Sequence, residues 1–235
     1  MDPGDLYQLL QHCIPNDHAR QVKSTYYVEQ LMRGGPPGQR VMDLGCGPGG
    51  SVELFRGFDP DVDWHGVDIE ASPEVAGRTR TDAPFHTYDG VHLPFDDDSF
   101  DIIYSHQVFE HVRQPDRLMG DVARVLRSGG AFIGSVSGLE PYHSFSLCNY
   151  TPYGWHMLLA DAGLELVELR PGIDGIALIK RQYMGRPAWA MKWVDSSPLN
   201  EEIDEWGKRT GRRPALINLR KLQYCGHLVF HARKP

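Results

Sequence analysis

Short apolar runs alternate with helix-length amphipathic stretches along most of the chain. The apolar runs predict strands at 40–44, 64–68, 84–87, 100–105, 131–136, 164–169 and 222–231. The amphipathic stretches predict helices at 17–33, 51–58, 116–127 and 151–162. Strands separated by helices are typical of βαβ units, which build a mostly parallel sheet. The pattern therefore predicts a single α/β domain over residues 1–235.

The order of these elements divides the domain into functional parts. Right-handed crossovers place the loops after the strand carboxyl ends along one edge of the sheet, where ligands bind. Residues 1–38 are expected to form an N-terminal helical cap, 39–136 the cofactor-binding half and 137–235 the substrate-side half. The stretch at about 171–221 is too long for a hairpin, so it is expected to be a helical insertion that serves as a lid or binding element.

A glycine-rich turn follows the first predicted strand, in the run VMDLGCGPGG at 41–50. Gly45, Gly47 and Gly50 fit the GxGxxG spacing, so a dinucleotide is one candidate ligand. Asp43 distinguishes the ligands, because a carboxylate at the strand end would repel a pyrophosphate. It would attract the ammonium group of a bound methionine moiety through a charge-assisted hydrogen bond.

Two further acids follow the second and third predicted strands. Asp68, in GVDIE, can accept hydrogen bonds from both hydroxyls of a ribose, which would also suit NAD. Asp89 can accept from the exocyclic amine of an adenine, and Gly90 beside it permits close backbone approach. Each acid alone could be a turn residue or a helix cap. Three acids at successive strand ends indicate one nucleoside ligand with an amino group.

The motifs DLGCGPGG, GVDIE, DGVHLPFDDDSFDIIYSHQVFEHV and LRSGGAFIGSVS over about 40–136 together resemble class I S-adenosylmethionine-dependent methyltransferases. Within that class they resemble the small-molecule group that includes ubiquinone- and sterol-type enzymes. The resemblance implies a Rossmann-like three-layer sandwich, whose seven-stranded, mostly parallel sheet has an antiparallel last strand. It implies S-adenosyl-L-methionine as cofactor. The residues implied to contact it are Asp43, Gly45, Gly47, Asp68, Ile69, Asp89, Gly90, Ser105 and His106. Tyr26 and Tyr27 are candidates for closing over it.

Histidines near the expected acceptor side are candidates for a general base. A base helps if the acceptor is a hydroxyl, and histidine has a suitable pKa. His106 follows the fourth strand, and His143 lies in the loop after the fifth. Either is a catalytic candidate, whereas His111 is expected to make a structural hydrogen bond at the start of a helix. Around His143, a set of aromatic residues could line an acceptor pocket: Tyr142, Phe145, Tyr150 and Tyr153.

Composition narrows the partners and the compartment. The chain carries 24 basic and 31 acidic residues, a net charge of −7, so nucleic acid is a disfavoured partner. A basic cluster late in the chain is interpreted as a solvated face or, alternatively, as a clamp for an anionic part of the substrate: Lys208, Arg209, Arg212, Arg213, Arg220 and Lys221. The four cysteines lack CxxC spacing, and neither a membrane span nor a secretion signal is evident. These features predict a cytoplasmic protein.

The run Asp96-Asp97-Asp98 is the obvious candidate for a metal site. Three consecutive acids cannot all face one ion from a regular backbone, and their place before a strand favours a solvated turn. No metal is therefore predicted.

The sequence favours methyl transfer to a small-molecule acceptor, most simply the hydroxyl of a sugar or specialised metabolite. Nitrogen and carbon acceptors stay open, as does an RNA or protein acceptor. An NAD(P) oxidoreductase sharing only the glycine turn is a further alternative, and so is a cofactor-binding protein without catalysis. A homodimer is also left open.

Overall fold

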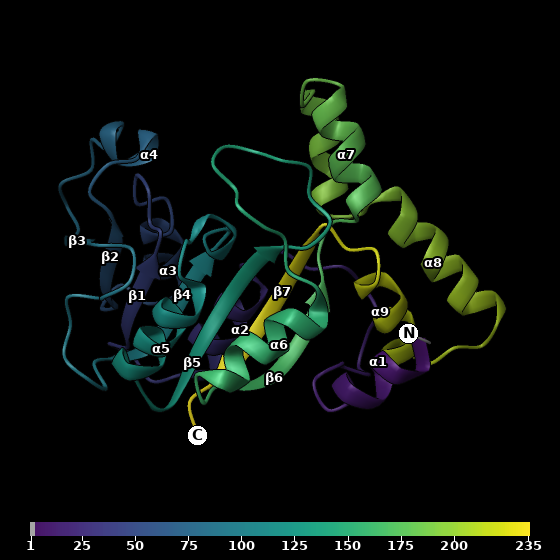
Figure 1. The fold of residues 1–235 in the computed structure, drawn as a ribbon, viewed down its shortest axis with the longest axis horizontal. Coiled ribbons are helices and arrows are strands. Elements are labelled where there is room, and N and C mark those ends of the chain that lie inside the picture. Colours follow the sequence, from purple (N-terminus) through teal and green to yellow (C-terminus); the bar gives the residue numbers. More distant parts are fainter. Residues whose placement is uncertain (1–2) are drawn as a thin grey trace.

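A seven-stranded sheet crosses the middle of the computed structural model, which describes residues 3–235 (Figure 1). The strands are β1 (Arg40–Leu44), β2 (Asp63–Ile69), β3 (Phe85–Tyr88), β4 (Phe100–His106), β5 (Leu126–Ser137), β6 (Glu165–Pro171) and β7 (His227–Arg233). They are ordered β3-β2-β1-β4-β5-β7-β6, and β7 runs antiparallel to both of its neighbours. The predicted mostly parallel sheet with an antiparallel last strand is confirmed.

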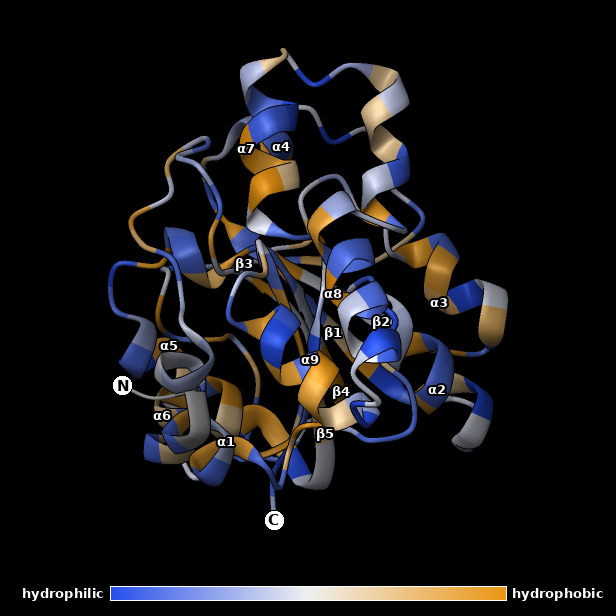
Figure 2. Cartoon of the chain, turned by 90° about the vertical axis from the view of Figure 1, so that its right-hand side faces the viewer, coloured by the Kyte–Doolittle hydropathy of each residue, from blue (hydrophilic) through white to orange (hydrophobic). Residues whose placement is uncertain are grey.

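Helices cover both faces of this sheet and make three layers. On one face lie α1 (Pro3–Leu10), α5 (Pro115–Val125), α6 (Pro152–Asp161) and α9 (Pro214–Leu222), while α2 (Tyr26–Gly34) and α3 (Val52–Phe58) cover the other. The alternation of side chains along β5 explains the two cores: Phe132 packs with Trp155 of α6, whereas Ile133 packs with Tyr27 and Val28 of α2. Figure 2 shows hydrophobic strands at the centre and helices banded with hydrophobic and hydrophilic residues.

An inserted set of helices separates β6 from β7, as the sequence predicts. It consists of α7 (Gly175–Tyr183), the 3₁₀ helix η2 (Ala188–Val194), α8 (Pro198–Arg209) and α9. Asp174 joins two of these helices, because its carboxylate accepts from Ala177 N at 2.7 Å and from Leu199 N at 3.1 Å. The insertion has a small core of its own that includes Leu178 and Trp193. In Figure 1, α7 and α8 extend beyond the end of the sheet.

The predicted helix at 17–33 is wrong in its first half. The helix begins at Tyr26, and residues 17–25 run as an irregular segment. Tertiary partners take the polar groups that a helix would use internally: Asp17 pairs with the buried Arg170 at 2.8 Å, and Val22 N donates to Pro171 O at 3.0 Å. Lys221 Nζ donates to Ala19 O at 2.6 Å.

Other boundaries also differ from the predicted ones, most of all at the start of β5 and of β7. The helix predicted at 116–127 ends at Val125, and β5 begins at Leu126, so the run Ser128-Gly129-Gly130 lies in a strand. The last strand begins at His227, not at 222, because Leu222 still packs within α9 and Gly226 N donates to Ile173 O at 2.7 Å. The helix α1 is an element that the sequence patterns did not predict, and α4 (Pro73–Ala76) is another.

The basic cluster at 208–221 is not one charged face. Lys221 is only 1% exposed and pairs with Asp204 at 2.7 Å. Arg220 places its guanidinium 4.0 Å from the centroid of the Trp206 ring, and Arg213 donates to the hydroxyl of Tyr7. The interpretation as a fully solvated basic face is therefore wrong at these positions. In residues 3–235, no helix is long and apolar enough to cross a membrane.

Candidate functional site

The glycine turn after β1 has a backbone that only glycine adopts without strain. Gly45 has φ of 73° and donates its amide to Val67 O at 2.8 Å, which closes the turn against β2. A Cβ on Gly45 would lie 2.3 Å from Cγ2 of Val108. Gly47 also has a positive φ, 48°. The turn therefore places backbone atoms without side chains at the carboxyl edge of the sheet, where a ligand can approach them closely.

Asp68, near the end of β2, joins that strand to the glycine turn. Its Oδ2 accepts from Gly47 N at 2.7 Å, and its Oδ1 accepts from Ile69 N at 2.8 Å. A carboxylate has about four acceptor positions, so two remain for a ligand. The side chain of Ile69 is 41% exposed beside it, which leaves an apolar surface at the same strand end.

Asp43 is almost fully buried at the end of β1, with 5% of its surface exposed. Ser51 Oγ donates to its Oδ2 at 2.6 Å, and Trp64 Nε1 donates to that hydroxyl oxygen at 2.9 Å. Burial raises the pKa of Asp43 to about 7, although the Ser51 hydrogen bond opposes the shift, and the charge of Asp68 adds to it. The group is therefore near its midpoint at neutral pH.

Asp89 and Gly90 form a tight turn after β3. The carboxylate of Asp89 accepts from His92 Nδ1 at 2.8 Å, and also from the backbone amides of Val91 and His92. The bond from the His92 side chain, followed by the two amides, holds the pKa of Asp89 well below its usual range. Gly90 has φ of 92°. The carboxylate of Asp89 is exposed at the expected edge of the sheet, and its contact with adenine stays a prediction.

Ser105 and His106 end β4, which pairs with β1 so that Ser105 lies opposite Leu44. Ser105 is fully buried, and its Oγ has no hydrogen-bond partner among residues 3–235. His106 Nδ1 lies 2.8 Å from Ser135 Oγ. Desolvation by the surrounding protein, together with the nearby His227, lowers the pKa of His106 to about 4. The ring is therefore neutral at physiological pH and a weak base.

A second polar group lies at the ends of β5 and β7 and is built around Glu140. Glu140 Oε2 accepts from His227 Nε2 at 3.0 Å and from Ser137 Oγ at 2.6 Å. Its Oε1 lies 3.6 Å from Nδ1 of His143. The pKa of Glu140 is below its usual value, because the bonds to His227 and Ser137 outweigh the desolvation that would raise it. His143 therefore faces a carboxylate that is ionised at neutral pH.

Glu110 joins this group from the 3₁₀ helix η1 (Phe109–His111). It is fully buried, with Oε1 2.8 Å from Ser137 Oγ. Burial raises the pKa of Glu110. His111 lies in η1, not at the start of α5 as expected, and its ring makes an edge-to-face contact with that of His143, with centroids 5.2 Å apart.

Some predicted site residues lie elsewhere. Tyr27 is fully buried in the core against His231, and Tyr26 packs against Arg170, so neither is placed to close over a ligand at the glycine turn. In the loop after β5, Tyr142 and Phe145 are 73% and 72% exposed. Of the other two aromatic residues, Tyr150 donates its hydroxyl to Phe109 O, and Tyr153 lies at the start of α6.

Several residues at this edge carry no sequence signal that would have revealed them. Ser51 and Trp64 come together only because α3 packs against β2. Arg78 donates to Gly47 O at 2.6 and 2.8 Å and lies 4.0 Å from the centroid of the Phe85 ring, which braces the glycine turn. Glu110 and Glu140 could have been noted as acids beside candidate histidines.

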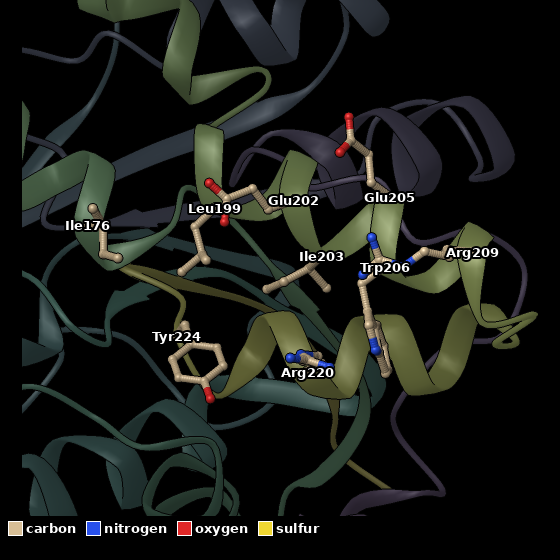
Figure 3. Close-up of a pocket in the computed structure, with 9 residues that line it drawn as sticks. All are labelled: Ile176, Leu199, Glu202, Ile203, Glu205, Trp206, Arg209, Arg220 and Tyr224. Atoms are coloured by element: carbon tan, nitrogen blue, oxygen red, sulfur yellow. The ribbon is translucent and has the colours of Figure 1, made fainter.

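A cavity of about 510 Å³ lies in the inserted helices, away from the glycine turn (Figure 3). It is bounded by α7, α8 and α9. Arg220 and Trp206 stand side by side on one wall, with Tyr224 further along, and Glu202 and Glu205 come from α8 (Figure 3). It shares no lining residue with the strand-end site.

The doubly covered sheet, the glycine turn and the acids at the strand ends define a Rossmann-like nucleoside-cofactor enzyme. The family model described as a methyltransferase domain matches residues 42–134. An uncharacterized methyltransferase of Mycobacterium tuberculosis is 36% identical over 193 residues, which cover 72% of this chain and 74% of that protein. This chain belongs to the class I S-adenosylmethionine-dependent methyltransferase family, whose cofactor is S-adenosyl-L-methionine.

Two further comparisons set the extent of the likeness. An uncharacterized methyltransferase of Mycobacterium avium is 36% identical over 136 residues, so the alignment spans about half of each protein, 52%. The structure of an S-adenosylmethionine-dependent methyltransferase from Mesorhizobium loti has a TM-score of 0.56 at 17% identity and covers 89% of this chain and 97% of that chain. That likeness confirms the fold. The family match favours methyl transfer over the NAD(P) oxidoreductase alternative.

Proposed function

We propose that this protein transfers a methyl group to a hydroxyl oxygen of a small molecule, such as a sugar or a specialised metabolite. The observation that carries the proposal is the group of histidines and glutamates at the ends of β4, β5 and β7. Of these strands β4 lies next to β1, which carries the glycine turn, and β5 and β7 follow β4 in the sheet. Such groups can accept a proton from a hydroxyl or orient it.

The residues at the glycine turn suit the family's cofactor. The buried carboxylate of Asp43 would hold the ammonium group, and Asp68 with Ile69 would hold the ribose and adenine. Asp89 and Gly90 would border the adenine, and Ser105 and His106 would lie near the sulfur. When bound, the cofactor supplies a methyl carbon already activated by a positive sulfur. The chain must then exclude water and hold the acceptor oxygen about 3–3.5 Å from that carbon.

Of the two histidines predicted as bases, His143 is the one we favour. His106 has a pKa of about 4, which makes it a poor proton acceptor, and its Nδ1 is engaged with Ser135. His143 lies on the loop after β5 and has Glu140 at 3.6 Å to stabilise its protonated form. We therefore assign proton removal to His143 and a positioning role to His106.

Replacing His143 with alanine is expected to lower kcat by about 100-fold or more, because general-base assistance contributes on that order. Affinity for S-adenosylhomocysteine should stay within about threefold of wild type, since the residue does not touch the cofactor-binding turn. Turnover on a panel of hydroxylated acceptors and calorimetric binding provide the two measurements. His106→Ala is the matched variant, and its kcat should fall much less. Wild-type turnover in His143→Ala would overturn the assignment.

The pKa of Asp43 makes cofactor affinity depend on pH. The ammonium group of the ligand needs the ionised carboxylate of Asp43. In the protein without ligand, that carboxyl group is half protonated near pH 7. Affinity for S-adenosylhomocysteine should therefore rise about tenfold between pH 6 and pH 8 and level off above that. Calorimetric titration at several pH values measures this rise. Asp43→Asn should bind more weakly and lose the dependence.

The same pKa shift has the opposite sign for stability. Because the folded pKa lies above the unfolded value, the folded state holds the proton to higher pH. The contribution of Asp43 to the free energy of unfolding of the free protein should fall as pH rises from about 4 to 7. Urea unfolding of wild type and Asp43→Asn over that window checks the sign, and a slope that the substitution leaves unchanged would contradict the raised pKa.

An RNA or protein acceptor is the second candidate, and the structure weakens its main support. Four of the six basic residues at 208–221 have partners inside the molecule, namely Arg212, Arg213, Arg220 and Lys221. The alternative of an anionic clamp survives only for Lys208 and Arg209. We also propose a cytoplasmic location, which the four free cysteines suit.

A further inference from the structure

Three potential metal ligands converge at the acceptor side of the site. Glu110 and His111 come from η1, and His143 comes from the loop after β5. Their ligand atoms, one carboxylate oxygen and two imidazole nitrogens, all lie within 4.8 Å of one another. His143 lies 32 residues beyond His111 in the sequence, so only the fold brings it to the other two.

We propose that Glu110, His111 and His143 bind one divalent transition-metal ion of the Zn²⁺ type. Two imidazoles and one carboxylate are ligands that such ions prefer, and three protein ligands are typical of a catalytic site that keeps positions open for substrate or water. The site is distinct from Asp96-Asp97-Asp98, on which the prediction of no metal rested. Asp97 and Asp98 lie in an exposed turn, where they pair with Arg124 and Lys234.

The second oxygen of Glu110 is an independent sign that a ligand belongs here. The residue is 0% exposed, and its Oε2 has no hydrogen-bond partner among residues 3–235. A buried carboxylate oxygen without a partner is costly. The carboxylate of Glu110 has an oxygen within 4.8 Å of ring nitrogens of both His111 and His143, so a cation among the three would supply the missing interaction.

Neighbouring side chains hold Glu110 in place, as the outer shell of a metal site does. Ser137 Oγ lies 2.8 Å from Glu110 Oε1. The amide of Gln107 is best oriented with its nitrogen toward the same oxygen, also at 2.8 Å, and with its oxygen toward Ser135. Glu140 stands on one side of the His143 ring. These contacts orient the carboxylate of Glu110 and the ring of His143.

The ion's chemical role rests on the proposed hydroxyl methylation, whereas its binding does not. In the ion-bound protein His143 is a ligand, so the ion takes over from it as the group that activates the acceptor. It lowers the pKa of a bound hydroxyl, whose proton then leaves to water. An ion of this type with three protein ligands would bind two neighbouring oxygens of one molecule by expanding from four to five ligands. The acceptor class is therefore a vicinal diol or a comparable pair of neighbouring oxygens.

The test is a titration of the full-length, tag-free protein with Co²⁺, whose visible absorption reports its ligands, followed by competition with Zn²⁺. We expect one equivalent to bind. Glu110→Gln keeps the size of the side chain, and His143→Ala alters a loop residue; each should weaken Co²⁺ binding at least tenfold. His86→Ala is the control, since His65 and His86 form another close histidine pair, 3.1 Å apart, and it should bind like wild type.

Each outcome decides the proposal. Absence of a one-to-one complex in wild type would overturn it, and so would His143→Ala binding Co²⁺ as tightly as wild type. Loss of binding in His86→Ala, with His143→Ala unaffected, would place the ion elsewhere and also overturn it. If Glu110→Gln does not fold, by circular dichroism, His143→Ala decides. Methyl transfer that persists after chelation would reject the ion's role yet leave the proposed function standing. Co²⁺ binding without methyl transfer to any hydroxylated acceptor would reject the proposed function yet leave the metal site standing.

Discussion

Replacing Asp68 with asparagine is expected to weaken S-adenosylhomocysteine binding by about 100-fold. The carboxylate already accepts from Gly47 N and Ile69 N, and we propose that its remaining acceptor positions bind the ribose hydroxyls. Hydrogen bonds to a charged group contribute about 1.5–3 kcal/mol each, and 1.4 kcal/mol corresponds to a tenfold change in affinity. Asparagine removes the charge and one acceptor oxygen, so both the ligand contacts and the bracing of the glycine turn are weakened. Calorimetry with purified protein measures the change.

Glu70→Gln provides the matched control, because Glu70 is an exposed acid just beyond the same strand. It removes the same charge and should change the affinity by less than about threefold, since exposed charges contribute little. Equal losses in the two variants would mean that Asp68 acts only through the general negative field of this edge. Unchanged binding in Asp68→Asn would remove the residue from the cofactor site.

Replacing Gly134 with alanine is expected to destabilise the fold by about 4 kcal/mol, at the upper end of what single substitutions cost. Gly134 lies opposite Ser105 where β5 pairs with β4, and its φ is 152°. A Cβ there would lie 1.7 Å from Ser105 O, which is backbone and cannot move aside alone. The two strands must separate at the residues that precede and position His106. Urea unfolding followed by tryptophan fluorescence measures the loss.

Gly129→Ala separates the clash from the cost of backbone conformation. Gly129 also has a positive φ, 77°, but a Cβ there meets nothing within 4 Å. Only the strain of a left-handed residue remains, about 1 kcal/mol. If Gly134→Ala cost no more than Gly129→Ala, the close approach of the two backbones would be refuted.

The cofactor half of this protein was predictable because its signals are local. Asp43 and Asp68 each follow an apolar run, and the carboxyl ends of parallel strands always meet at one edge. The bounds of β1 match the predicted strand, and the helix and strand types up to Ser137 were mostly correct. The acids and glycines therefore revealed the class of cofactor before any contact was known. The local pattern did not reveal the linked hydrogen bonds in this half, such as those from Trp64 to Ser51 and from Ser51 to Asp43.

The segment before Tyr26 shows where such reasoning fails. Its composition suits a helix, yet Asp17 and Ala19 bond to Arg170 and Lys221, which lie more than 150 residues further along. A buried cation without a partner is more costly than a missing turn of helix, so the tertiary pairing prevails. No window of sequence contains both partners of such a bond.

The sequence by itself determined the α/β class, the glycine turn and the acids that name the cofactor, because strand periodicity and turn chemistry act between neighbouring residues. Only the tertiary structure decided that Glu110, His111 and His143 meet, that Glu140 faces His143, and that Ser135 engages the ring of His106. Those properties depend on distance and burial. Both are set by how β4, β5 and β7 pack side by side, and neither is written in the spacing of residues along the chain.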